Sequence, residues 1–434
     1  MPRLIALGGS VTVAALLLTT AGAQAGGSWG RAKVLDRERV GPPSVATAEK
    51  KGAASASWID DRGQAFVVRF RNSKWEAPER FGERGKVADL NVLESDDGSR
   101  ALAVWARVRP NGKLRAVMAA GRTGTRWGRA EVVMSGANYR GIDVSLSSDG
   151  ERAVAVVEAG VAGDPRQSAL YSATMRGSQW AKPHLITQQG EISDVHLVMD
   201  PSAARSVLAY QVAPPQGGGE RIVVRDGSPA KWSAEQTVAT GSREYDSLFL
   251  ADAALGGDTV MVGWGRTDDE ADRQASVSVR TAGNWSVQSL SPQPVNQISV
   301  GVANNGTSGL AVFQERDPLG TMAARAQSWT SGTWGAPVTI GSDTAGLGVS
   351  DTRLVMSRSG AHATATWLAV DECCGRVLHS ADYRVGSGWT GDQRVSQRSV
   401  RSYAVASARQ GRRVVAVFDH PADKPTIEAV VKAG

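Results

Sequence analysis

The sequence predicts an all-β fold: an eight-bladed β-propeller of four-stranded antiparallel blades, closed by its N-terminal strand. Three observations lead to this prediction. Tryptophans recur at nearly even intervals, each interval contains the same series of strand and turn signals, and the two ends of the chain complement each other. A fixed period of this size is typical of repeat architectures and outweighs any local pattern.

The first observation is a series of tryptophans that follow short turns rich in Gly, Ser, Asn and Lys. Successive members are 46 to 55 residues apart. The series is Trp29, Trp75, Trp127, Trp180, Trp232, Trp285, Trp334 and Trp389. A large flat side chain on the outermost strand suits the wedge between two neighbouring sheets.

The second observation is the content of each interval, which the segment after Trp127 illustrates. It contains "RAEVVM", then "DVSLSSDGER" ending in a glycine turn, then "RAVAVVEA" and "LYSATMR". Alternation with a period of two, β-branched residues and Gly/Asn/Asp turns indicate strands. Four short strands in about 51 residues are typical of a propeller blade.

The third observation concerns the two ends. After an apolar N-terminal segment, the chain begins with a lone tryptophan strand, "SWGRAKVLD". It finishes with three strands and no tryptophan: "YAVASARQG", "RRVVAVFDH" and "TIEAVVKAG". The first strand is therefore expected to complete the last blade and close the ring. Seven blades with an additional extension is the alternative.

The N-terminal segment predicts export. Arg3 precedes an apolar run from Leu4 to Leu18, and Ala23-Gln24-Ala25 forms an A-x-A-like cleavage site. We expect residues 1–25 to be a signal peptide, cleaved before Gly26, and residues 26–434 to be a single propeller domain that is secreted. A retained membrane anchor is the alternative, although the apolar run is short for a membrane span.

The charge distribution and the cysteine content limit the kinds of partner and cross-link that the sequence predicts. The chain has 49 basic and 43 acidic residues, and these charges are scattered along it. The sequence shows no basic patch interleaved with aromatic residues, which is the pattern that would argue for nucleic-acid binding. The only cysteines, Cys373 and Cys374, are adjacent and cannot join distant segments. We expect a vicinal disulfide that stiffens a loop, the alternatives being a soft-metal site or a bond to another chain.

The tryptophan turn resembles a degenerate Asp-box, S-x-D-x-G-x-x-W, of sialidase-like and BNR-repeat propellers. The G-x-x-W half is present at Gly124 to Trp127, Gly177 to Trp180 and Gly386 to Trp389. Ala120 and Arg122 stand where the first of these units would carry Ser and Asp. The resemblance implies the propeller fold. It does not extend to sialidase activity, because the early R-I-P motif of those enzymes is absent.

Candidate site residues recur where the first strand of each blade begins. Five of the eight are aspartates, and the series is Ser44, Asp89, Asp143, Asp194, Asp246, Ser299, Asp351 and Tyr403. Clustered carboxylates at the mouth of a central channel could bind Ca²⁺ or a hydroxyl-rich ligand, or supply an acid–base pair. The simpler interpretation, which we favour, is that each aspartate caps a turn through backbone N–H groups.

A second recurring position lies on the second strand of each blade. It carries Trp58, Trp105, Val157, Tyr210, Trp264, Phe313, Trp367 and Phe418. Because the position repeats around the ring, we expect it to form the core between blades rather than a platform for sugars.

Two functions fit these features. We favour an exported scaffold without catalytic activity that recognises a protein or polysaccharide outside the cell. It needs no cofactor, and we expect it to be a monomer. The alternative is a glycan-processing hydrolase or lyase, with Asp143, Asp194 and Asp246 as the first candidates for acid and base. A propeller fold alone does not decide between them.

Overall fold

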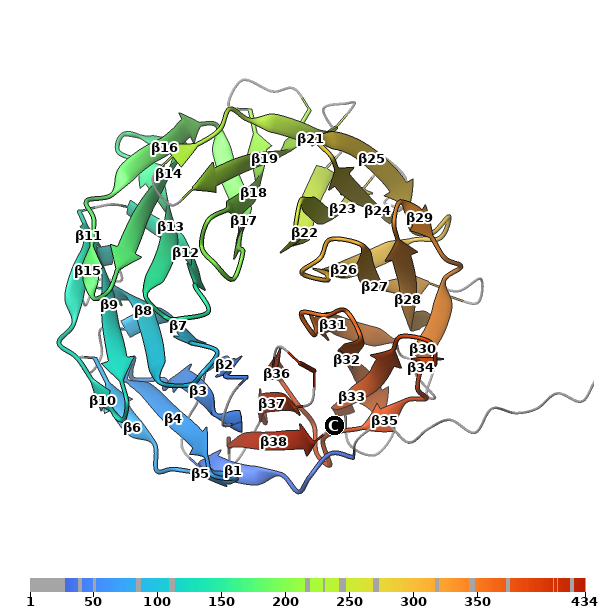
Figure 1. The fold of residues 1–434 in the computed structure, drawn as a ribbon, viewed down its shortest axis with the longest axis horizontal. Coiled ribbons are helices and arrows are strands. Elements are labelled where there is room, and N and C mark those ends of the chain that lie inside the picture. Colours follow the sequence, from blue (N-terminus) through green and yellow to red (C-terminus); the bar gives the residue numbers. More distant parts are fainter. Residues whose placement is uncertain are drawn as a thin grey trace, which may run out of the picture.

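A computed structural model describes most of the chain as a ring of radial β-sheets (Figure 1). The residues described are 28–37, 41–49, 52–82, 87–108, 114–136, 138–214, 219–228, 231–241, 247–267, 273–316, 320–342, 348–371, 375–408, 410–411, 413–421 and 425–433. The expected signal peptide, Asp246, Cys373 and Cys374 lie outside these ranges.

Eight sheets surround the axis, and the first strand of each lies innermost in Figure 1. This confirms the predicted all-β, eight-bladed propeller of four-stranded antiparallel blades. Among the described residues no helix is long and apolar enough to cross a membrane.

The first four blades follow one another in the sequence. Blade one contains β2 (Ser44–Thr47), β3 (Ala54–Ile59), β4 (Ala65–Arg71), β5 (Lys74–Trp75) and β6 (Glu79–Phe81). Blade two contains β7 (Val87–Glu94), β8 (Arg100–Val108), β9 (Leu114–Thr123), β10 (Arg126–Trp127) and β11 (Glu131–Ser135). Blade three contains β12 (Asn138–Leu146), β13 (Arg152–Val161), β14 (Asp164–Arg176), β15 (Gln179–Trp180) and β16 (His184–Gln189). Blade four contains β17 (Glu191–Met199), β18 (Ser206–Ala213), β19 (Arg221–Ser228), β20 (Lys231–Trp232) and β21 (Gln236–Thr240).

The second half repeats the pattern. Blade five contains β22 (Ser247–Gly256), β23 (Thr259–Thr267), β24 (Arg273–Thr281) and β25 (Asn284–Ser289). Blade six contains β26 (Val295–Val302), β27 (Ser308–Arg316), β28 (Met322–Thr330), β29 (Thr333–Trp334) and β30 (Val338–Ser342). Blade seven contains β31 (Val349–Met356), β32 (His362–Asp371), β33 (Gly375–Arg384), β34 (Gly388–Trp389) and β35 (Gln393–Arg394). Blade eight contains β36 (Ser402–Ser407), β37 (Arg413–Asp419), β38 (Ile427–Ala433) and, from the other end of the chain, β1 (Lys33–Asp36).

Blade eight confirms the predicted closure of the ring. β1 pairs antiparallel with β38, with Lys33 opposite Ala429, and Trp29 forms a further bridge to Lys432. Leu35 of β1 also belongs to the apolar cluster that joins blade eight to blade one. The two ends of the chain therefore share one sheet and one core.

The outermost strand of most blades is split into two short pieces that both pair with the third strand. Proline explains three of these interruptions, because it has no N–H to donate to the ladder. The prolines are Pro78, Pro183 and Pro337, each three residues after a tryptophan of the series. Blade five has Trp285-Ser286-Val287 instead, and its outermost strand β25 is continuous.

The core lies between blades, as the second-strand aromatics predict. Trp58, Tyr210, Phe313, Trp367 and Phe418 are among the largest fully buried side chains. The blade six backbone approaches the Trp367 ring so closely that a Cβ added at Gly341 would lie 2.1 Å from Cζ2 of the ring. A glycine at this position therefore allows the indole to pack against the neighbouring sheet.

Candidate ligand site at the channel mouth

A cavity of about 620 Å³ opens among the innermost strands of blades four to eight. Asp194 and His196 of β17 line it on one side, and Asp351 and Arg353 of β31 line it on another. Other residues of its wall are Phe249, Asp252, Asn296, Gln297, Ser299 and Val405. The site therefore combines side chains from blades that are far apart in the sequence.

Three of the predicted aspartates occupy the same structural position. Asp89, Asp194 and Asp351 each lie at a β-bulge of the innermost strand, where the pairing register shifts. Their φ angles are 51°, 48° and 50°, in the left-handed region that Asp tolerates better than most residues. A bulge turns a side chain away from the regular alternation of the strand, and such bulges are frequent next to functional sites.

Asp143 lies at a different level. It pairs with Val156. The residue before it, Ile142, pairs with Val157, which occupies the second-strand position that is aromatic in the other blades. This places Asp143 two residues beyond the bulge position, level with His196, Asp252, Ser299 and Arg353 of the later blades. The five predicted aspartates therefore do not share one register, and Asp246 is outside the described residues.

Asp143 uses both of its carboxylate oxygens to bind backbone amides. Oδ1 accepts a hydrogen bond from Val144 N at 2.7 Å, and Oδ2 accepts one from Leu197 N, in the next blade, at 2.6 Å. Burial raises the pKa of this carboxyl, against the opposing effects of the Leu197 amide and His196. Its role is to join the innermost strands of blades three and four.

Asp252 repeats this arrangement two blades further on. Oδ1 accepts from Ala253 N at 2.8 Å, and Oδ2 accepts from Val300 N at 3.0 Å and from the Ser299 hydroxyl at 2.8 Å. Ser299 Oγ in turn accepts from Leu354 N at 3.1 Å, which carries the connection into blade seven. Burial raises the pKa of Asp252, and His196 opposes this.

Asp194, His196 and Arg353 are charged or titratable side chains of the cavity wall, as are Asp252 and Asp351. Asp194 accepts no hydrogen bond from any described residue, and burial raises the pKa of its carboxyl while His196 lowers it. Arg353 Nε lies 3.1 Å from Asp351 Oδ1, and its guanidinium carbon lies 4.7 Å from the centre of the Tyr403 ring. The cavity can therefore contact both a cationic and an anionic group of a ligand.

A second group of acids lies beside Asp194, at the junction of blades three and four. Arg140 Nη1 lies 3.8 Å from Glu158 Oε1 and 3.7 Å from Glu191 Oε1. Burial raises the pKa of Glu158 to about 7, the Arg140 cation opposes this, and Asp194 and Glu191 raise it further. A carboxyl with this pKa exchanges its proton near neutral pH.

The structure offers no cation cage among the residues it describes. In those ranges no group of three or more His, Cys, Asp or Glu side chains is placed to hold a metal ion. Calcium binding stays a prediction from the sequence. The vicinal disulfide of Cys373 and Cys374 also stays a prediction, because both residues are outside the described ranges.

Sequence reasoning missed Asp252, Glu158 and Arg353. The signal for Asp252 and Arg353 was present in the sequence. Each lies as many residues before the turn that follows the first strand of its blade as Asp143 does in blade three. Glu158 gave no such signal, since its neighbours Arg140, Glu191 and Asp194 come from three separate stretches of the chain. Its environment exists only once blades three and four are packed together.

Comparisons with known proteins define the class of fold. The chain is similar to the WD40 domain of SCAP from fission yeast, with 12% identity, 93% of this chain and 98% of that chain covered, and a TM-score of 0.52. It is also similar to a puromycin hydrolase, with 12% identity, 88% and 59% coverage, and a TM-score of 0.51. An α-L-arabinanase of Penicillium chrysogenum matches with 9% identity, 93% and 98% coverage, and a TM-score of 0.44.

The first two likenesses support the β-propeller fold and no more, because propellers with such low identity serve unrelated functions. No family model matches the chain. No curated protein matches it in sequence. The resemblance to Asp-box repeats therefore rests on the residues quoted above.

Proposed function

We propose that this protein is an exported recognition scaffold that binds an extracellular protein or a glycan of the cell envelope at the mouth of its central channel. Export is inferred from the N-terminal segment that ends at Ala25. The ring supplies a rigid frame, and the variable loops and channel-mouth side chains supply the recognition surface.

One observation carries this proposal: two carboxylates of the innermost strands, Asp143 and Asp252, are used to hold the blades together. Asp143 and Asp252 accept hydrogen bonds from Leu197 N and Val300 N of the following blades. A carboxylate with both oxygens bound to amides is poorly suited to transfer a proton to a substrate. It is well suited to fixing the positions of the residues that line the cavity.

The ligand is expected to be polar and to carry charge. Asp194 and His196 face the cavity from blade four, and Arg353 faces it from blade seven. Hydroxyl groups, a cationic group near Asp194 and an anionic group near Arg353 would all find partners there. A sugar chain or a charged loop of a protein meets these requirements.

The test uses residues 26–434 on an array of neutral, uronate-containing and phosphate-containing oligosaccharides, together with immobilised envelope proteins. We expect a ligand whose affinity falls at least tenfold in Asp194→Asn and in Arg353→Gln. Asp258→Asn is the matched control, because the Asp258 side chain is 98% exposed and does not line this cavity. Absence of any ligand, or equal binding by all the variants, would contradict the proposal.

A glycan-processing hydrolase or lyase is the second candidate, and one observation favours it. Glu158, with a pKa of about 7, interacts electrostatically with the Asp194 carboxylate. A protonated acid close to an ionised one is the arrangement that glycoside cleavage requires. Release of reducing ends from an oligosaccharide array, abolished by Glu158→Gln, would support this function over the scaffold.

A further inference from the structure

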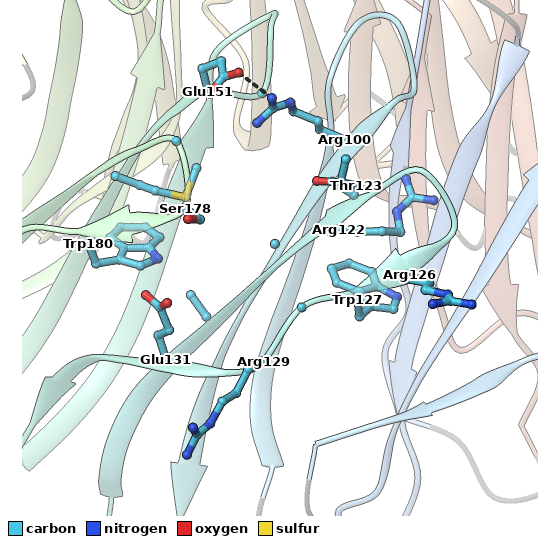
Figure 2. A pocket seen from close by; sticks show the side chains of 17 residues that line it. Arg100, Arg122, Thr123, Arg126, Trp127, Arg129, Glu131, Glu151, Ser178 and Trp180 are labelled. Atoms are coloured by element: carbon cyan, nitrogen blue, oxygen red, sulfur yellow. Dashed lines mark ion pairs between the residues drawn. The ribbon is translucent and has the colours of Figure 1, made fainter.

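A second hollow, separate from the channel mouth, lies on the outer side of the ring between blades two and three. Its volume is about 720 Å³, and both Trp127 and Trp180 line it. Figure 2 shows the two indoles on opposite sides of this groove, with Glu131 below Trp180 and the ion pair of Arg100 and Glu151 above. Two aromatic rings that face one hollow form a surface suited to a flat apolar face of a ligand.

The corresponding groove between blades four and five has a network of ion pairs and hydrogen bonds at this place. There, Asp226 accepts hydrogen bonds from Arg205 and from Arg280. Arg280 also binds Gln236, whose Oε1 accepts a hydrogen bond from the Trp285 indole at 3.0 Å. The guanidinium of Arg280 lies 5.2 Å from the centre of the Trp285 ring.

That second groove is also hollow, at about 860 Å³, but only Trp232 of its two indoles lines it. Arg205, Asp226 and Arg280 of its wall bind one another, so these recognition groups are already occupied. It therefore serves as an internal reference for the groove between blades two and three.

Strand pairing gives the equivalent residues in the groove between blades two and three. Met175 pairs with Trp180 as Arg280 pairs with Trp285, so Met175 replaces the arginine. Trp127 pairs with Arg122, and Trp232 pairs with Gly227. Gly121 and Asp226 come immediately before these two partners, so Gly121 stands where the other groove has its aspartate. The ion pair cannot form here. A Cβ added at Gly121 would meet no atom within 4 Å.

Some polar groups of this groove have no partner among the described residues, and others are paired. The Trp180 indole donates no hydrogen bond to any described residue, and Glu131 forms no ion pair with one. Arg122 and Arg100 are held by Glu94 and Glu151, at 2.7 Å and 2.5 Å respectively.

Two further arginines, Arg126 and Arg129, also line the groove and form no ion pair among the described residues. The unpaired charges are therefore two guanidinium groups and one carboxylate. This balance favours a ligand that is anionic and also carries hydroxyl groups.

We propose that the groove between blades two and three binds a carboxylate-bearing pyranose of an acidic glycan. The apolar face of the sugar ring packs on an indole, and its hydroxyls bind the Trp180 N–H and the Glu131 carboxylate. Arg126, which extends beyond Trp127, and Arg129, which extends from the lower end of the groove (Figure 2), bind the carboxylates of different sugars of the same chain. This site is independent of the channel mouth, with which it shares no residue.

The experiment is a calorimetric titration of residues 26–434 with tetragalacturonate, compared with neutral cellotetraose. We expect tetragalacturonate to bind and cellotetraose to bind at least tenfold more weakly. The double variant Gly121→Asp/Met175→Arg rebuilds the ion pair of the other groove, and we expect it to weaken tetragalacturonate at least tenfold. Circular dichroism and thermal unfolding verify that this variant is folded.

A milder variant keeps the test decisive if the rebuilt ion pair disturbs folding. Arg126→Ala/Arg129→Ala changes two exposed side chains, and we expect it to weaken tetragalacturonate at least fivefold. Lys231→Ala removes an exposed rim cation of the reference groove and should leave binding unchanged. Asp194→Asn, at the channel mouth, should also have no effect, which separates this site from the proposed function.

Three results would overturn the proposal. They are no binding of tetragalacturonate, equal binding of cellotetraose, and unchanged binding in both folded groove variants.

Discussion

The carboxylate of Asp143 in blade three lies 2.6 Å from the backbone nitrogen of Leu197 in blade four. The same relationship joins Asp252 in blade five to Val300 in blade six. Apolar packing fills the space between sheets but fixes their relative height only loosely, whereas a hydrogen bond to a chosen amide fixes it closely. These side chains therefore set the positions of the strands that carry Asp194, His196 and Arg353.

Asp252→Asn should lower the free energy of unfolding by about 1–3 kcal/mol, because the amide nitrogen of Asn cannot accept one of the hydrogen bonds from Ala253 N or Val300 N. Urea unfolding at pH 7 measures this. Asp258→Asn, on a fully solvated side chain, should change little. Equal stability of the two variants would show that the contact between blades is unimportant.

Leu35→Ala tests the closure of the ring. Leu35 is 9% exposed and packs in the cluster between blades eight and one, so its truncation should cost about 2–5 kcal/mol. Lys33→Ala, on the exposed part of the same strand, is the control. Thermal denaturation would refute closure by β1 if both variants melted together with the wild type.

Gly341→Ala tests the packing of blades six and seven. The new methyl group would lie 2.1 Å from Cζ2 of Trp367, and relief of this overlap should destabilise the protein by about 1–3 kcal/mol or more. Gly121→Ala is the matched control, because its methyl group meets no atom within 4 Å. Comparable melting temperatures for the two variants would contradict this account of the core.

Glu158 should make stability depend on pH. Burial raises its pKa in the folded state from 4.5 to about 7, so between these values the folded protein retains a proton that the unfolded chain releases. The contribution of Glu158 is therefore greatest below pH 4.5 and is lost as the pH rises to about 7.

Unfolding free energies measured between pH 4.5 and pH 8 should fall less steeply in Glu158→Gln than in the wild type. Glu131→Gln, on an exposed side chain, should follow the wild-type curve. If Glu158→Gln and the wild type had parallel profiles, the carboxyl would titrate normally.

Much of the fold was predictable because a propeller repeats its own sequence signals. The spacing from Trp29 to Trp389 gave the period, and the strands left over at the two ends gave the closure. The eight sheets confirm the period, and the pairing of β1 with β38 confirms the closure. The second-strand aromatics were predictable for the same reason, since a position that recurs in every blade faces the same environment in each.

The candidate site was predictable only in part. Asp89, Asp194 and Asp351 do share a position, at bulges of the innermost strand. Asp143 does not, because the pairing register of its strand shifts between Tyr139 and Gly141, before Asp143 is reached. A difference of two residues changes which neighbours a side chain meets, and single-sequence reading places strand boundaries less accurately than that.

The sequence by itself determined the strands, the period of the blades and the seam that closes the ring, since these follow from alternation and turn chemistry within about 50 residues. Only the tertiary structure decided what lines the channel mouth and the groove between blades two and three. The partners there belong to different blades, and their contacts depend on how far each sheet is turned and raised against the next. Gly121 and Met175 look unremarkable in the chain, and become a distinct opening only when compared with Asp226 and Arg280 in space.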